Sequence, residues 1–178
     1  LIFGARISLL VAAMGVLASG SIGAILGIVA GFYGGKMDSL IMRACDATFS
    51  LPIILLALLL AVVLGPSLAN IIYIVGLVLW ARYARVVRGE VLSWKEKEFI
   101  AYARVAGASS IKIMIRHLFP NIVNTLMVLI TFETGYVILL ESALSFLGAG
   151  VPPPTPSWGS MVADGRGYII TGWWLSVF

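Results

Sequence analysis

The feature that most constrains the fold is a long run without charge near the start of the sequence. From Ile7 to Phe32 no Asp, Glu, Lys or Arg occurs, and a helix needs about 20 apolar residues to cross the hydrocarbon core of a bilayer. Charged residues make up only 11% of the chain and hydrophobic residues 61%, whereas soluble domains carry about 25% charged residues. So little charge could not cover a surface that faces water, and the sequence therefore predicts an all-α integral membrane protein.

Further apolar runs predict further spans. They cover Ile53–Leu64, Leu68 to about Arg88, and Asn121–Leu147, and a fifth run begins near Thr171 and is cut off. Because the sequence starts at Leu1 without a Met and stops inside an apolar run, we expect sequence to be missing at both ends. Residues 33–50 are expected to form a loop with an interfacial helix. Residues 148–167, rich in Pro and Gly, are expected to form a loop.

The basic residues predict the orientation in the membrane. Residues 82–117 hold eight of the 12 Lys and Arg residues, and residues 33–50 hold Lys36 and Arg43. Cytoplasmic loops carry the excess of Lys and Arg, so both segments are expected to be cytoplasmic. Residues 148–170, with Arg166 as their basic residue, are then external.

Glycines in the first run predict close helix packing. They recur at spacings of three to five residues, and small residues at such spacing let helix backbones approach each other in lipid. General tolerance of glycine in membrane helices is the alternative. The glycines are Gly15, Gly20, Gly23, Gly27 and Gly31.

The segment from Glu98 to Asn121 reads as two short helices joined at Gly107. Ser109 or Ser110 can cap the second helix, and Pro120 is expected to restart the chain into the membrane. Exposed apolar groups rimmed by charge tend to mark docking surfaces. One face of the first helix holds Phe99, Ala103 and Ala106, and an apolar stripe on the second holds Ile111, Met114, Ile115 and Leu118.

This segment resembles the EAA loop of ABC importer permeases, in which Glu-Ala-Ala is followed after three residues by Gly and after nine more by a segment that ends in Leu-Pro. Gly107 takes the place of the glycine, and Tyr102 and Ala103 take the places of the two alanines. Ala101 stands where the family has its glutamate, so the acid is missing. The resemblance implies an ATPase-coupling site at Ala101, Tyr102, Ala103, Ala106, Gly107, Ala108, Ser109, Ile111 and Pro120.

Four other stretches resemble the C-type permease subunit of dipeptide, oligopeptide and nickel importers. They are GARISLL (4–10), GFYGGKMDSLIMR (31–43), LLESALSFLGAG (139–150) and PPTPSWGSMVADGR (153–166). The resemblance implies a single type I ABC importer transmembrane domain (MetI-like) over residues 1–178, with about five spans and the last one truncated. In the family, the missing parts are an N-terminal span and most of the last span.

The resemblance also implies the partners and the mechanism. The chain would form half of the translocation pathway as a heterodimer with a second, B-type permease subunit, and would couple to two cytoplasmic ATPase subunits. An external binding protein would deliver a dipeptide, an oligopeptide or nickel. The sequence contains no GxxxxGK[ST] phosphate loop, so ATP is expected to bind a partner subunit and no cofactor is expected. The chain would be a transport subunit of a bacterial or archaeal cell membrane, not an enzyme.

Two acids lie inside the Asn121–Leu147 run. Glu133 and Glu141 each face a cost of a few kcal/mol in lipid, so both are expected to face protein or water. Glu133, nearer the middle, is the stronger candidate for lining the pathway, and Glu141 could hold helices together near the outer end. Internal pairing is the alternative for both acids.

Other classes of function are less favoured. A single Cys45 and a single His117 give no cluster for a metal. Nucleic-acid binding by the basic helix–turn–helix is not expected, because its apolar stripe would lie too close to the bilayer to reach DNA. An ion-driven secondary transporter and a non-transporting membrane scaffold stay open as alternatives.

Overall fold

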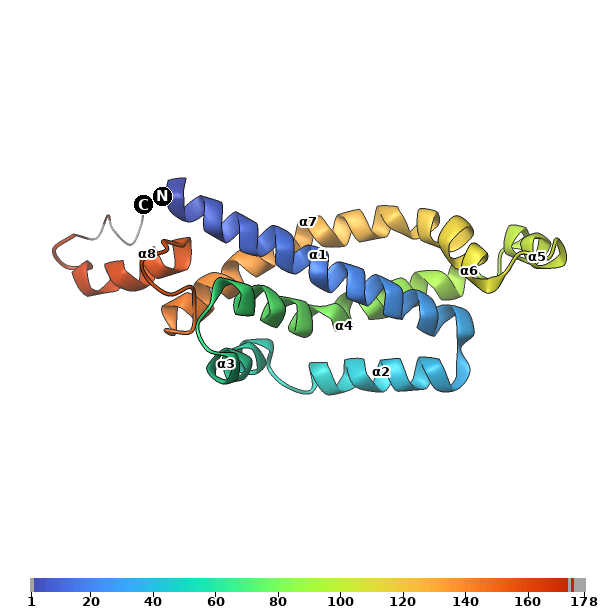
Figure 1. Ribbon diagram of the computed structural model, residues 1–178, viewed down its shortest axis with the longest axis horizontal. Coiled ribbons are helices and arrows are strands. Elements are labelled where there is room, and N and C mark those ends of the chain that lie inside the picture. Colours follow the sequence, from blue (N-terminus) through green and yellow to red (C-terminus); the bar gives the residue numbers. More distant parts are fainter. Residues whose placement is uncertain (1, 173, 175–178) are drawn as a thin grey trace. The chain divides into compact units, whose positions relative to one another are not determined.

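The computed structural model describes residues 2–172 and 174, and every regular element within these residues is helical. Figure 1 shows the helices in chain order. Between α6 and α7 lies a π-helical turn, Met114–Leu118, and after α8 lies a 3-10 turn, Arg166–Tyr168. The helices are α1 (Ile2–Tyr33), α2 (Gly35–Phe49), α3 (Ile53–Leu64), α4 (Leu68–Trp94), α5 (Glu98–Val105), α6 (Ser110–Ile113), α7 (Phe119–Phe146) and α8 (Trp158–Gly165).

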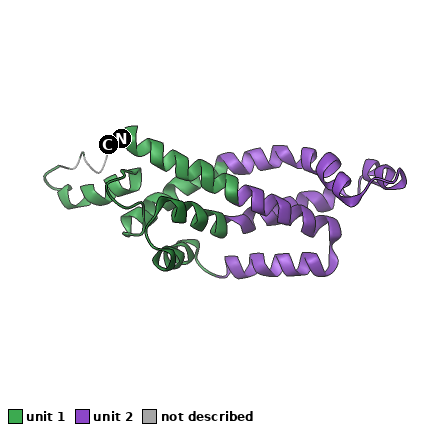
Figure 2. Ribbon diagram, viewed as in Figure 1, with its two compact units in different colours: residues 1–18, 51–78, 132–178 green, residues 19–50, 79–131 purple. Residues whose placement is uncertain are grey.

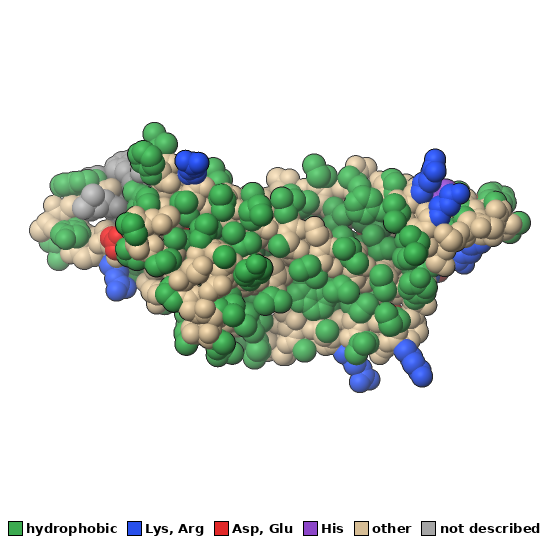
Figure 3. Space-filling model, viewed as in Figure 1, with side chains coloured by type: hydrophobic (Ala, Val, Ile, Leu, Met, Phe, Trp, Pro, Cys, Tyr) green, Lys and Arg blue, Asp and Glu red, His purple; other side chains and the backbone are tan. Residues whose placement is uncertain are grey.

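The long helices confirm three of the predicted spans. Ile2–Tyr33, Leu68–Trp94 and the continuous helical stretch Ser110–Phe146 are long and apolar enough to cross a membrane. The predicted span Ile53–Leu64 is a helix of 12 residues, which reaches the required length only if α2 and α3 together are one broken span. The fifth predicted span, from about Thr171, falls largely outside the described residues. Apolar side chains are spread along the whole face in Figure 3, and residues such as Val62, Val128 and Leu139 are at least 70% exposed. Such a surface suits lipid, so the chain is a multi-pass membrane protein.

The segments between the long helices contain two further helices. Residues 35–49 form α2, the helix expected within residues 33–50, and its Ile41 and Cys45 are buried with Ala30, Ala81 and Ala84. The 3.6-residue period of α2 thus buries one face against α1 and α4. Residues 148–167 were expected to form a loop, whereas the chain forms α8 there, with a reciprocal capping box of Ser157 and Ser160 at its start.

The chain divides into two compact units, shown in Figure 2. Unit 1 comprises residues 1–18, 51–78 and 132–178, and unit 2 comprises residues 19–50 and 79–131. The basic segment and the EAA-like segment belong to unit 2. Glu133, Glu141 and α8 belong to unit 1.

Glycines of α1 pack directly on α4 in unit 2, which confirms the prediction of close packing there. A Cβ added at Gly23 would lie 2.4 Å from the carbonyl oxygen of Trp80, and one at Gly27 would lie 2.6 Å from that of Ala84. At Gly31 the nearest atom would be Val91 Cβ, at 2.7 Å. These positions leave no room for a side chain, so the two helix backbones meet through glycine.

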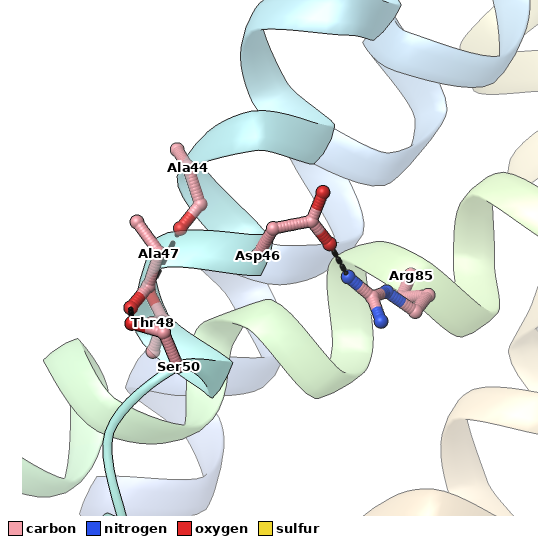
Figure 4. A network of polar contacts seen from close by, with 6 residues as sticks. All are labelled: Ala44, Asp46, Ala47, Thr48, Ser50 and Arg85. Atoms are coloured by element: carbon pink, nitrogen blue, oxygen red, sulfur yellow. Dashed lines mark hydrogen bonds and ion pairs between the residues drawn. The ribbon is translucent and has the colours of Figure 1, made fainter.

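Two ion pairs connect α2 to α4 within unit 2. The Arg88 guanidinium donates to both oxygens of Asp38, from Nε at 2.5 Å and from Nη2 at 2.6 Å. Arg85 pairs with Asp46 near the other end of α2 (Figure 4). There the Thr48 and Ser50 hydroxyls donate to the carbonyl oxygens of Ala44 and Ala47, so the last turn of α2 is closed by its own side chains.

Candidate functional site

The candidate site begins where α4 ends. The chain turns after Trp94, with Lys95 N–H donating to Val91 O at 2.9 Å and Lys97 N–H to Trp94 O at 3.1 Å. Helix α5 then runs from Glu98 to Val105, with Glu98 in its first turn and Arg104 in its last. That order of charge complements the helix dipole at both ends, which helps a helix of two turns to form.

A glycine turn ends α5. Gly107 has φ 78, in the left-handed region that glycine enters without steric cost. The N–H of Gly107 donates to Arg104 O, and the N–H of Ala108 donates to Ala103 O, each at 3.0 Å. This pair of bonds is a Schellman motif, which satisfies carbonyls that the end of a helix leaves free. The predicted bend at Gly107 is confirmed.

Ser109 starts the second helix of the site. Its side chain accepts a hydrogen bond from Lys112 N–H at 3.3 Å, as an N-cap does. Helix α6 follows as a single turn, and the chain continues through the π-helical turn Met114–Leu118 into α7. The predicted cap and the two helices joined at Gly107 are therefore present.

One detail of the predicted second helix is wrong. Pro120 does not restart the chain, because the helical path is continuous from Ser110 to Phe146 and Pro120 lies in the first turn of α7. Within the predicted apolar stripe, Ile111 and Ile115 are 64% and 65% exposed, while Leu118 is buried. Ile113, outside the predicted stripe, is also buried.

Exposed apolar groups surround the turn. Tyr102 is 68% exposed and Val105 is 89% exposed, and Ala101, Ala106 and Gly107 are also exposed. Lys and Arg side chains gather around α5 and α6 in Figure 3. A shallow hollow of about 490 Å3 is lined by Ala103, Ala106, Gly107, Ala108, Ser109, Lys112 and His117. The structure thus brings the predicted residues 101–112 together as one apolar surface with a basic rim.

An aromatic and polar cluster supports this surface from behind. Phe99 of α5 lies with its ring centroid 6.2 Å from that of Trp94 and 6.5 Å from that of His117. Trp94 Nε1 donates to Glu90 Oε2 at 3.1 Å, and Thr125 Oγ1 donates to Glu90 Oε1 at 3.1 Å. We name Glu90, Trp94, Phe99, His117 and Thr125 the support cluster.

The support cluster joins α4, α5 and α7, and sequence reasoning missed it. Asn121 Nδ2 also donates to His117 O at 2.6 Å, and the Arg104 guanidinium lies 5.6 Å from the Phe32 ring centroid. The signal was present in the spacing, because Glu90 and Trp94 are four residues apart and so share a helix face. The apolar rings and charges of unit 2 thus hold α5 at a defined place.

The two membrane acids do not belong to this site. Glu133 is 3% exposed and Glu141 is 0% exposed, and both lie in unit 1. Glu141 accepts hydrogen bonds from Ser8 and Ser145. This geometry suits an internal clamp at Glu141, and the pathway role of both acids stays a prediction.

Comparison with known proteins identifies the family. Residues 23–177 match the family described as binding-protein-dependent transport system inner membrane component. The dipeptide transport system permease protein DppC of Bacillus subtilis is 40% identical over 176 residues, which are 99% of this chain and 55% of that protein. The oligopeptide transport system permease protein OppC of Haemophilus influenzae is 39% identical over 175 residues, 98% of this chain and 56% of the relative.

The glutathione transport system permease protein GsiD of Escherichia coli is 41% identical over 175 residues, 98% of this chain and 58% of that protein. The chain therefore spans somewhat more than half the length of these curated relatives. Its all-helical architecture is the MetI-like fold of type I ABC importers. The chain belongs to the family of binding-protein-dependent transport system inner membrane components.

Proposed function

We propose that this chain is a membrane-spanning permease subunit of an ABC importer that takes up peptides, and that residues 101–112 couple it to cytoplasmic ATPase subunits. ATP binding and hydrolysis take place on those partners. A second permease subunit completes the pathway, and an external binding protein delivers the peptide. The chain lies in the cell membrane, with residues 82–117 on the cytoplasmic side.

The observation that carries this proposal is the turn at Gly107. A Schellman motif fixes the turn, and Tyr102, Val105 and Ile111 around it are at least 64% exposed. Apolar groups that protrude into water beside the membrane are stabilised when a partner covers them, because burial of apolar surface lowers the free energy. A protein partner with an apolar groove and acidic groups would match both the protruding residues and the basic rim.

The support cluster gives the proposed coupling a physical path. A partner that pushes on α5 displaces Phe99, whose ring lies against Trp94 of α4 and His117 ahead of α7. Glu90 accepts hydrogen bonds from both Trp94 and Thr125, so a displacement of α5 would move α4 and α7 together. Coupling of this kind requires that ATPases and peptide prefer different conformers of the permease.

The proposed substrate class is peptides. The relatives are named for dipeptide, oligopeptide and glutathione transport, and these ligands share peptide bonds and charged ends. Nickel, the other substrate that the sequence resemblance implied, stays an alternative. Glu133 is proposed to line the pathway, because a carboxylate there would attract the cationic end of a peptide.

The experiment is ATPase assembly in the complete complex, co-expressed and purified through a tag on this chain. Gly107→Arg is expected to abolish ATPase co-purification, because a side chain at φ 78 is strained by about 1–2 kcal/mol and the long side chain would hold the apolar surface of the partner away from the turn. Gly167→Arg is the matched control, since a Cβ there also meets no atom within 4 Å. Equal ATPase recovery with both variants contradicts the coupling role.

Peptide uptake that persists without any associated ATPase would instead favour an ion-driven transporter. In that case Glu133→Gln is expected to remove the dependence of uptake on the ion gradient. The absence of both ATPase association and peptide uptake would favour the membrane scaffold. The three classes therefore differ in two measurements made on one preparation.

A further inference from the structure

Three stretches that are far apart in the sequence meet in one buried cluster of unit 1. Ser8 comes from GARISLL in α1, Glu141 and Ser145 come from LLESALSFLGAG in α7, and Trp158 comes from the PPTPSWG stretch at the start of α8. Ser8 and Glu141 are 0% exposed, and Ser145 is 7% exposed. None of these residues belongs to the proposed coupling site, so the coupling role does not explain why they are buried together.

The hydrogen bonds of the cluster lead from α8 through Ser8 to Glu141. The backbone N–H of Trp158 can only donate, and it donates to Ser8 Oγ at 3.1 Å. Ser8 has one hydroxyl proton, which it donates to Glu141 Oε2 at 3.2 Å. Ser145 donates to the other carboxyl oxygen, Oε1, at 2.7 Å. Glu141 thereby orients Ser8 as an acceptor toward α8.

Ser8 acts as a cap for α8 that comes from another helix. The first N–H groups of a helix have no partner within it. Ser157 Oγ accepts from Ser160 N–H at 3.2 Å, which is the local N-cap bond. Trp158 N–H, at the first position of α8, is satisfied by Ser8 instead. The start of α8 therefore depends on α1 and, through Ser8, on Glu141.

Glycines bring α8 into direct contact with α7. A Cβ added at Gly159 would lie 2.5 Å from Ser142 Cα and 2.7 Å from Ser145 Cβ. One added at Gly150 would lie 2.4 Å from Ser145 Cα. Residues 150–159 thus pack on α7 with no space between the backbones, and small changes at the cluster will displace them.

The segment that packs on α7 also has an exposed surface. A hollow of about 420 Å3 is lined by residues 150–156, by Ser160 and Asp164, and by Pro66 of the turn between α3 and α4. Charge distribution along the sequence places this segment outside the cell. An external partner would therefore meet α8 and the proline-rich stretch before it.

We propose that Glu141 is a positioning residue that, through Ser8, holds residues 151–165 in the conformation on which the peptide-loaded binding protein docks. This inference rests on the proposed function. The binding protein is the occupant because the family depends on one and the charge pattern places the segment outside. Close packing of the segment on α7 would lower the ordering cost of docking. Disturbing the cluster should weaken docking and leave ATP hydrolysis itself intact.

The test is a titration of peptide-loaded binding protein on the full complex in proteoliposomes, with ATPase rate as readout. Ser8→Ala removes the acceptor for Trp158 N–H and is expected to raise the half-saturating concentration at least about fivefold, the equivalent of about 1 kcal/mol. Basal ATPase and the rate at saturation should stay within about twofold, because a docking defect is overcome by concentration. Glu141→Gln keeps an acceptor and a donor and should behave as wild type.

Controls separate docking from folding. Thr131→Ala removes a hydroxyl that bonds only within α7, to Met127 O, and should change nothing. Glu141→Leu should show the Ser8→Ala defect more strongly; where it fails to assemble, Ser8→Ala and Ser145→Ala carry the test. An unchanged half-saturating concentration in Ser8→Ala overturns the positioning role while wild-type stimulation stands. Absence of stimulation in the wild type itself overturns the proposed importer and the docking role with it.

Discussion

Replacing one glycine of α1 should loosen the contact between α1 and α4. At Gly23 a Cβ would lie 2.4 Å from Trp80 O, 2.4 Å from Tyr83 Cβ and 2.9 Å from Ala84 N. Two of these three atoms are backbone, so no side-chain rotation can make room. Ordinary contact begins at 3.4 Å, so α1 must move away from α4 by about 1 Å at this point.

The expected magnitude combines two opposing effects. Overpacking of this kind costs about 1–3 kcal/mol, whereas Ala in place of Gly favours the helix by about 1 kcal/mol. Gly23→Ala should therefore destabilise the chain by up to about 2 kcal/mol. Gly89→Ala is the matched control on α4, because a Cβ there meets no atom within 4 Å, and it should be neutral or stabilise by up to about 1 kcal/mol.

The assay is unfolding of the full chain in detergent, followed by loss of helical circular dichroism as a denaturing detergent is titrated in. The helix-propensity gain is common to both variants, so they should differ by the overpacking cost alone, about 1–3 kcal/mol in free energy of unfolding. Equal midpoints for Gly23→Ala and Gly89→Ala would refute the conclusion that glycine at this position is needed for helix contact. Gly23→Leu should enlarge the loss, because its longer side chain meets the same backbone.

The remaining predictions concern topology, the pathway and the ion pair. In a cysteine-free background, Cys at Gly167 should react with an impermeant reagent added outside and Cys at Lys97 should not; the reverse pattern would invert the proposed orientation. Glu133→Gln should lower peptide transport by more than about twofold at equal expression if the acid lines the pathway, and a smaller change would identify an internal clamp. Asp38→Ala should destabilise by about 2 kcal/mol in the same detergent titration, because the Arg88 guanidinium loses two charged hydrogen bonds. Asp38→Ala combined with Arg88→Ala should recover part of that loss, and simple additivity would argue against direct coupling.

Much of the fold was predictable because lipid imposes simple requirements. The charge-free run Ile7–Phe32 lies within α1, and the bend at Gly107 follows from a glycine between two short apolar patterns. The helix at residues 35–49 was expected but its packing was not predictable, because Lys36, Asp38, Arg43 and Asp46 indicate only an interfacial segment. In the structure Asp38 and Asp46 pair with arginines of α4, a long-range match that no local pattern reveals.

The polar clusters were the least predictable part of the site. Ser8 and Glu141 are separated by 133 positions in the sequence, and Glu90 and Thr125 by 35. A hydroxyl in an apolar helix gives no sign of its partner, since its nearest acceptor is decided by tertiary packing. Sequence alone therefore identified Glu141 as buried or functional, but not its hydrogen bond to Ser8 of α1 or the link through Ser8 to the start of α8.

The π-helical turn at Met114–Leu118 constrains the length of the chain as well as its chemistry. Phe119 N–H donates to Met114 O, five residues back, so the turn holds one residue more than an α-helical turn. The extra residue is accommodated in one wide turn, so deleting one residue of this stretch would leave regular α-helix with the segments on both sides close to their present directions. Deleting one residue of α7 after this stretch would instead rotate everything before it by about 100°, and Ile111 and the Gly107 turn would then point in a new direction. A single-residue deletion between 114 and 118 should therefore preserve contact with a partner far better than one between 121 and 131.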